Sequence, residues 1–176
     1  MSNYLIPLMV VVPMLCAILV NAFAKFNKSI KVLTFVVAIC LPIIPLLSNY
    51  GLHFFGGYTP MLDNATGVIY HPAITYAFDM LQQIFIVAVG LITFLVAFIY
   101  LSKYKKASGQ YLFLLFMGTA SVTALMLTDD IFNMFVFFEI LALVQVGIVI
   151  ASPMDYSYEM ALKYMILGSI GSPIML

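Results

Sequence analysis

Two ionisable residues, Glu139 and Lys163, lie within apolar stretches of the sequence. A charged side chain inside a bilayer is energetically costly, so such residues are rare and face the interior of a helix bundle or a water-filled cavity. When a lysine lies beside a carboxylate, the proton affinity of each group depends on the position of the other. The two residues together could load and release a proton, or they could form a static ion pair.

Each residue also has a simpler interpretation. Glu139 could remain protonated and only hydrogen-bond to a neighbouring helix, but an apolar or amide residue would pack there at a lower cost. Lys163 is shallow enough to extend to the lipid headgroups, and Glu159, four residues earlier, could be its partner. Because Glu139 and Lys163 are expected on consecutive antiparallel helices at depths about 8 Å apart, their combination favours a shared role in proton movement.

Three polar residues precede Glu139 at the expected outer end of its helix. Asp129 and Asp130 are interpreted first as acids that offset the dipole at a helix N-terminus. Together with Asn133, they are also candidates for an access path by which protons reach Glu139. In the same way, Asp79 is expected to be the N-cap of the third membrane helix.

The composition indicates the elements that must position these residues. Charged residues make up 8% of the 176-residue sequence and apolar residues 65%, whereas about a quarter of a soluble domain is charged. At about 20 residues per span, we predict an all-α membrane protein, a polytopic helical bundle in one membrane domain over 1–176. It has five complete transmembrane helices and an incomplete sixth. The expected spans are 4–24, 32–47, 80–101, 111–128, 131–151 and 156–176, with an outer loop over 48–79 whose turn residues favour a small hairpin.

The lysines predict the orientation of this bundle. Six of the seven lysines lie in the connections after the first and third spans. Cytoplasmic loops collect lysine and arginine, so these connections are expected in the cytoplasm of a multi-pass cell-membrane protein. The N-terminus, the loop over 48–79 and the segment that contains Asp129 and Asp130 are then outside.

Several function classes do not fit this sequence. Seven lysines balance seven acidic residues, so nothing indicates nucleic acid as a partner. Cys16 and Cys40 lack metal-ligand or redox spacing and are interpreted as packed thiols. His53 and His71 both fall in the outer loop, so no membrane histidine pair could ligate haem. We therefore expect no metal site and no cofactor, and we assign any electron transfer to partner subunits.

The segments around the two central residues resemble a known family. Residues 130–140 and 161–169 are similar to the fifth- and sixth-helix motifs of the antiporter-like membrane subunits. These subunits are shared by Mrp-type sodium/proton antiporters, respiratory complex I and membrane-bound energy-converting hydrogenases. The resemblance covers nearly the whole chain. The segments 55–60 and 168–173 most resemble the F subunit of energy-converting hydrogenase B.

The resemblance implies roles for Glu139 and Lys163. Glu139 matches the essential helix-five glutamate and Lys163 the helix-six lysine, which relay protons along a hydrated axis at mid-membrane. Such subunits have many more helices, arranged in two inverted repeats. We therefore expect this chain to be the N-terminal part of a longer subunit, as a fragment, a split gene product or a truncated reading frame.

The leading hypothesis is proton or sodium translocation by a non-redox subunit of a membrane hydrogenase or related oxidoreductase, with other membrane subunits as partners. The alternative is a non-conducting structural or assembly subunit that keeps the motifs. In that case Gly168 and Gly171, which favour close helix packing, would matter more than the charged residues. A small-solute permease is a third hypothesis, but the sequence contains no substrate-binding signal for it.

Overall fold

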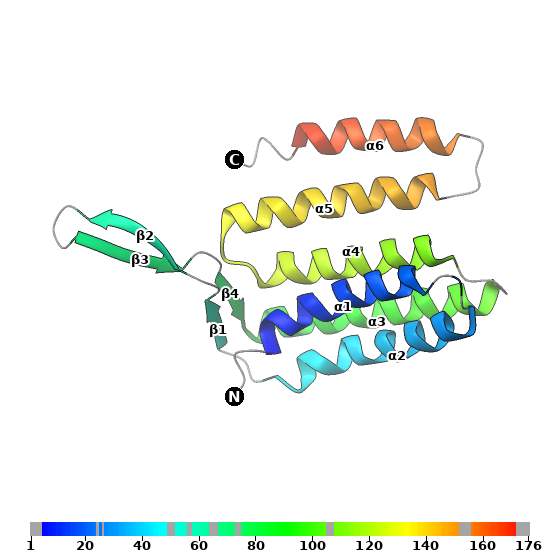
Figure 1. The fold of residues 1–176 in the computed structure, drawn as a ribbon, viewed down its shortest axis with the longest axis horizontal. Coiled ribbons are helices and arrows are strands. Elements are labelled where there is room, and N and C mark those ends of the chain that lie inside the picture. Colours follow the sequence, from blue (N-terminus) through cyan, green and yellow to red (C-terminus); the bar gives the residue numbers. More distant parts are fainter. Residues whose placement is uncertain are drawn as a thin grey trace.

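Six helices dominate this computed structural model and confirm an all-α membrane fold (Figure 1). The helices are α1 (Leu5–Ala22), α2 (Asn27–Leu46), α3 (Met80–Lys103), α4 (Gly109–Leu127), α5 (Ile131–Ile150) and α6 (Ser157–Gly171). The structure describes residues 5–23, 25, 27–48, 52–55, 58–63, 67–72, 75–104, 108–151 and 156–171.

Four of these helices, α1, α3, α4 and α5, are long and apolar enough to cross a membrane. The apolar part of α2, Ile30–Leu46, is shorter, and α6 has 15 residues. The count of five complete spans therefore stays a prediction. The part of the expected sixth span after 171 lies outside the described residues.

Helices α1 and α4 lie at the centre of the region in which side chains are best packed. Their inward faces contribute to two buried apolar clusters, one near each end of the bundle, to which α2 and α3 also contribute. Ile6 of α1 and Leu127 of α4 belong to the first cluster, and Val20 and Phe116 belong to the second. All four side chains are fully buried, so apolar burial, the main favourable term in packing, is concentrated here.

Helix α2 approaches α3 closely at a proline. A Cβ added to Gly90 would lie 2.8 Å from the backbone nitrogen of Pro42, so only glycine permits this contact. The side-chain nitrogen Nε2 of Gln83 donates a hydrogen bond of 2.9 Å to the carbonyl oxygen of Pro45. This bond adds a side-chain donor to a carbonyl in the last turn of α2, where the carbonyls of a helix lack their usual intrahelical donors.

The outer loop forms two antiparallel strand pairs in place of the single hairpin that the sequence favours. β1 (Leu52–Phe55) pairs with β4 (Thr75–Phe78), and β2 (Tyr58–Asp63) pairs with β3 (Gly67–Pro72). The β2–β3 pair extends away from the helices (Figure 1). An isolated two-stranded pair is marginally stable, and β4 is anchored by Phe78, which is fully buried in the first apolar cluster.

The strands and the connections after α1 and α3 lie at opposite ends of the molecule (Figure 1). Asp79 is the N-cap of α3, and its backbone N–H donates to the side-chain oxygen of Gln82 at 3.0 Å. The N-cap prediction for Asp79 is therefore confirmed. The arrangement keeps the lysine-bearing connections at one end, while the orientation in the membrane stays a prediction.

Candidate functional site

Helix α5 lies between α4 and α6 (Figure 1). On the side toward α4, Val144 packs against Gly118: a Cβ added to Gly118 would lie 3.2 Å from Cγ1 of Val144. On the side toward α6, Ala142 packs against Gly168: a Cβ added to Gly168 would lie 3.5 Å from the Cβ of Ala142. At about 100° per residue, Glu139 lies about 60° around the helix from Ala142. The carboxylate of Glu139 is therefore on the side toward α6.

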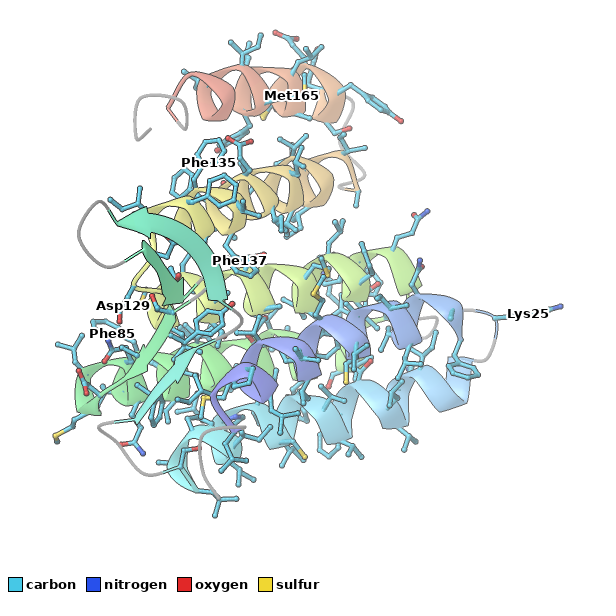
Figure 2. The ribbon with its side chains drawn as sticks, turned by 60° about the vertical axis from the view of Figure 1, so that its left-hand side comes forward. Lys25, Phe85, Asp129, Phe135, Phe137 and Met165 are labelled. Carbon is cyan, nitrogen blue, oxygen red and sulfur yellow. The ribbon has the colours of Figure 1, made fainter. Side chains whose placement is uncertain are left out.

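Two phenylalanines show the same division of α5. In Figure 2, Phe135 lies between α5 and α6, whereas Phe137 lies toward α4. Phe137 packs against the first apolar cluster. Phe135 is one turn before Glu139 and shares its face, because residues four apart lie one above the other. Phe135 and Glu139 therefore lie next to each other along the boundary between α5 and α6.

Glu139 is partly buried. Among the described residues, the structure contains no hydrogen bond or ion pair to its carboxylate. A carboxylate without a counter-ion is costly to bury in an apolar helix and faces the interior of a bundle or a wet cavity. A role of Glu139 in proton transfer stays a prediction.

Lys163 has a partner on its own helix. Its Nζ lies 2.7 Å from Oε1 of Glu159, and the two side chains are 68% and 63% exposed. Helix α6 buries Ala161, and Gly168 faces Ala142 of α5. Lys163 is two residues after Ala161, about 200° around the helix. Lys163 therefore projects from the face of α6 opposite α5, and the structure pairs it with Glu159 and does not bring it to Glu139.

The two residues are also further apart in depth than the sequence indicates. The contact of Ala142 with Gly168 fixes the register of the antiparallel helices α5 and α6. Glu139 comes three residues before Ala142, and Lys163 comes five residues before Gly168. Because the helices are antiparallel, the two residues lie on opposite sides of this contact along the helix axes, eight residues apart in total. Their offset along the helix axes is therefore about 12 Å at 1.5 Å per residue, where the sequence indicates about 8 Å. Direct contact is excluded in this arrangement, because packed helix axes are themselves about 8–10 Å apart.

The polar residues at the start of α5 form a helix cap. Oδ2 of Asp130 accepts a hydrogen bond of 3.0 Å from the backbone N–H of Asn133. The side-chain Nδ2 of Asn133 donates to Oγ1 of Thr128, also at 3.0 Å. Asp129 is exposed, and its backbone N–H donates to the carbonyl oxygen of Thr75 at 3.1 Å. Asp130 therefore lies at the N-terminus of α5, the position expected of an acid that offsets the helix dipole. A proton access path through these residues stays a prediction.

Buried threonines form a second polar site that the sequence analysis did not identify. Oγ1 of Thr93 on α3 lies 3.0 Å from Oγ1 of Thr119 on α4, and Thr123 donates to the carbonyl oxygen of Thr119 at 2.8 Å. A cavity of about 10 Å³ adjoins Thr119 and Thr123, which is about the space that one water needs. The spacing of Thr119 and Thr123, four residues apart in an apolar helix, is the signal that could have indicated this site.

The cysteines and acidic groups provide no metal centre in the part of the chain that the structure describes. Cys16 is partly buried and free, whereas Cys40 is free and exposed. The interpretation of Cys40 as a packed thiol is therefore wrong in this structure. Cys40 lies on the outward side of α2, where helix periodicity places it away from the neighbouring helices.

No family model matches the sequence. The chain is 37% identical over 174 residues to the uncharacterized protein MJ1309 of Methanocaldococcus jannaschii, a match that covers 99% of this chain and 34% of the relative. It also shares its fold with a chain of the membrane-bound sulfane sulfur reductase, an archaeal respiratory membrane complex. The TM-score is 0.74 at 23% identity, over 96% of this chain and 34% of that chain. The chain thus spans about a third of the length of each match.

Proposed function

We propose that this chain is part of an antiporter-like membrane subunit that translocates protons, or sodium ions, within a multisubunit hydrogenase or related oxidoreductase complex. The observation that carries the proposal is Glu139, a partly buried carboxylate on the α5–α6 boundary without a counter-ion among the described residues. Such a group is costly to keep inside a membrane helix and is typical of ion pathways.

Two further observations support this proposal. The chain shares its fold with a chain of an archaeal respiratory membrane complex, and four of its helices have the length and composition of membrane spans. We infer that other membrane subunits are its partners and that redox chemistry takes place in those subunits. Resemblance to the F subunit of energy-converting hydrogenase B supports a hydrogenase as the complex.

The proposed relay needs groups between Glu139 and Lys163. An axial offset of about 12 Å is too long for a direct proton transfer between the two side chains, so water or polar groups from other helices must connect them. The outward face of α6 carries Lys163 among exposed apolar side chains such as Leu162 and Leu167. Because the matched relative is about three times as long as this chain, we propose that further helices of such a subunit cover this face and enclose the lysine.

The proposal is tested by Glu139→Gln in the complete complex, reconstituted in sealed vesicles. We expect proton pumping to fall at least about tenfold, because loss of a group that transfers protons typically costs about 10²–10⁴-fold in rate. Asp63→Asn is the control, because Asp63 is an acid on β2, in the strand pair that extends away from the helices (Figure 1). Subunit composition and hydrogenase or reductase turnover with an artificial acceptor report assembly. Unchanged pumping with normal assembly would remove Glu139 from the mechanism.

A non-conducting structural or assembly subunit is the second candidate function. The pairing of Lys163 with Glu159 on an exposed face favours it, because a surface ion pair needs no transport role. This candidate predicts that substitutions of Glu139 and Lys163 leave transport intact, whereas bulky substitutions of Gly168 or Gly171 disturb complex assembly. The same vesicle assay, with subunit composition measured in parallel, separates the two candidates.

A further inference from the structure

A groove of about 690 Å³ lies at the end of the molecule where α3 ends and α4 begins. One part of its lining is apolar and comes from two helices, with Val96 and Ile99 on α3 and Ile148 on α5. The other part is polar, with Lys103, Ser108 and Gln110. The groove is within the size range of ligand sites, and its lining changes from apolar to cationic along the direction of α3.

Three tyrosines give the polar part of the groove a fixed shape. The ring of Tyr100 stacks on that of Tyr111 with centroids 4.3 Å apart and also lies 4.9 Å from the ring of Tyr104. The hydroxyl oxygen of Tyr100 accepts a hydrogen bond of 2.9 Å from the backbone N–H of Ser108. Tyrosines of this kind are enriched where membrane helices meet the lipid headgroups.

The charge of the groove comes from Lys103. Its Nζ lies 5.5 Å from the ring centroid of Tyr104, and its side chain forms no ion pair with a described carboxylate. The sequence has no Asp or Glu between Asp79 and Asp129, so α3 and α4 carry no acid that could neutralise this lysine. The first backbone N–H groups of α4 begin beside it at Gly109, where a helix terminus adds a partial positive charge.

We propose that this groove binds a phospholipid with an anionic headgroup. The phosphate lies against Lys103 and the tyrosine hydroxyls, and an acyl chain follows the apolar wall between α3 and α5. A free phosphate would leave the apolar wall uncovered, and a zwitterionic lipid would not neutralise Lys103. The lipid would connect α3 to α5, and so the four-helix bundle to the helix that carries Glu139.

The test is native mass spectrometry of the full-length protein, delipidated in detergent and titrated with dioleoylphosphatidylglycerol or dioleoylphosphatidylcholine. We expect the anionic lipid to bind more tightly, and Lys103→Gln to weaken it about fivefold, which is the contribution of one lysine near a lipid surface. Lys25→Gln is the matched control, because Lys25 is an exposed lysine outside the groove. Inorganic phosphate at millimolar concentration is not expected to displace the lipid.

A second variant tests the apolar wall. Ala151 is exposed and lines the groove, so Ala151→Trp fills the space without disturbing a buried contact, and binding of both lipids is expected to fall. Equal affinity for the two lipids, equal effects of Lys25→Gln and Lys103→Gln, displacement by phosphate, or unchanged binding to Ala151→Trp would each overturn the proposal. Another polypeptide that copurifies in the groove and excludes the lipid would also overturn it.

Discussion

The region formed by α1–α4 and the region formed by α5 and α6 both contain long apolar helices but differ in packing. In the most apolar segment of α4, 44% of residues are buried inside the structure, against 6% for α5. Helix α5 is nevertheless the more apolar of the two. Hydropathy therefore reports only that a helix avoids water, and the contacts with neighbouring helices decide whether protein or lipid surrounds it.

Because of this difference, the residues that stabilise the fold and the residues of the proposed function lie in different regions. The α1–α4 region contains both buried apolar clusters, the Gly90–Pro42 contact and the threonine pair. The α5–α6 region contains Glu139 and Lys163 and has few fully buried side chains. We therefore expect substitutions in the first region to affect folding, and charge substitutions in the second to affect transport while leaving the fold intact.

The largest expected effect comes from matched phenylalanine substitutions. Phe116 of α4 is fully buried and Phe138 of α5 is 39% exposed. Phe116→Ala leaves a cavity and should lower the free energy of unfolding by about 3–5 kcal/mol, whereas Phe138→Ala should have a much smaller effect. Thermal unfolding in one detergent measures both. Similar losses of stability would show that the two regions are equally packed.

Glycine substitutions should have the next largest effect. In Gly90→Ala the new Cβ meets the backbone of Pro42 at 2.8 Å, and backbone atoms of packed helices cannot move aside. We expect a loss of about 1–3 kcal/mol. Gly118→Ala is the matched control, because its Cβ meets only the Val144 side chain, at 3.2 Å. If chemical denaturation gives the two variants equal stability, the close contact of α2 with α3 is not a constraint.

The threonine pair should contribute less. Thr93→Val removes one hydroxyl of the 3.0 Å contact with Thr119, which keeps its bond to the carbonyl oxygen of Leu115. The expected loss is about 1 kcal/mol, the net value of one hydrogen bond. Thr93→Ser is the control, because it keeps the hydroxyl. A loss of stability in the serine variant as large as that in the valine variant would assign the effect to packing.

The smallest effect on stability is expected for the ion pair of Glu159 with Lys163. Both groups are mostly exposed, and surface pairs contribute little because water and salt screen them. Glu159→Gln and Lys163→Gln should therefore leave the thermal midpoint unchanged at low and high salt. A clear, salt-sensitive decrease in either variant would indicate that the pair is enclosed.

Much of the helical architecture could be predicted because it depends on local properties. Helix α5 begins at Ile131, as the span expected over 131–151 does, and Asp79 is the N-cap of α3 as predicted. Asp130, interpreted as an acid at a helix N-terminus, is the N-cap of α5. Helix α2 begins at Asn27, five residues before the span expected over 32–47. The first turn of α2 is polar, and polar residues can adopt helical structure. A span defined by hydropathy begins only where the apolar residues begin, so it omits this turn.

The relation of Glu139 to Lys163 could not be predicted in the same way. Depths counted from the ends of apolar stretches give an offset of about 8 Å, whereas the register in the structure gives about 12 Å. The Ala142–Gly168 contact sets that register, and it joins two small residues far apart in the sequence. Nor does hydropathy identify the side of α6 that faces α5, because its exposed side is also apolar.

The sequence by itself determined that this is a helical membrane protein, where most of its helices lie, which acids lie at helix N-termini, and that an acidic residue falls within α5. These properties follow from composition, periodicity and local hydrogen bonding within each segment. Only the tertiary structure decided that α4 is more deeply buried than α5, that Lys163 pairs with Glu159, and that a groove with Lys103 at its polar end lies between α3 and α5. The physical reason is that facing and register depend on contacts between helices, which no single segment specifies.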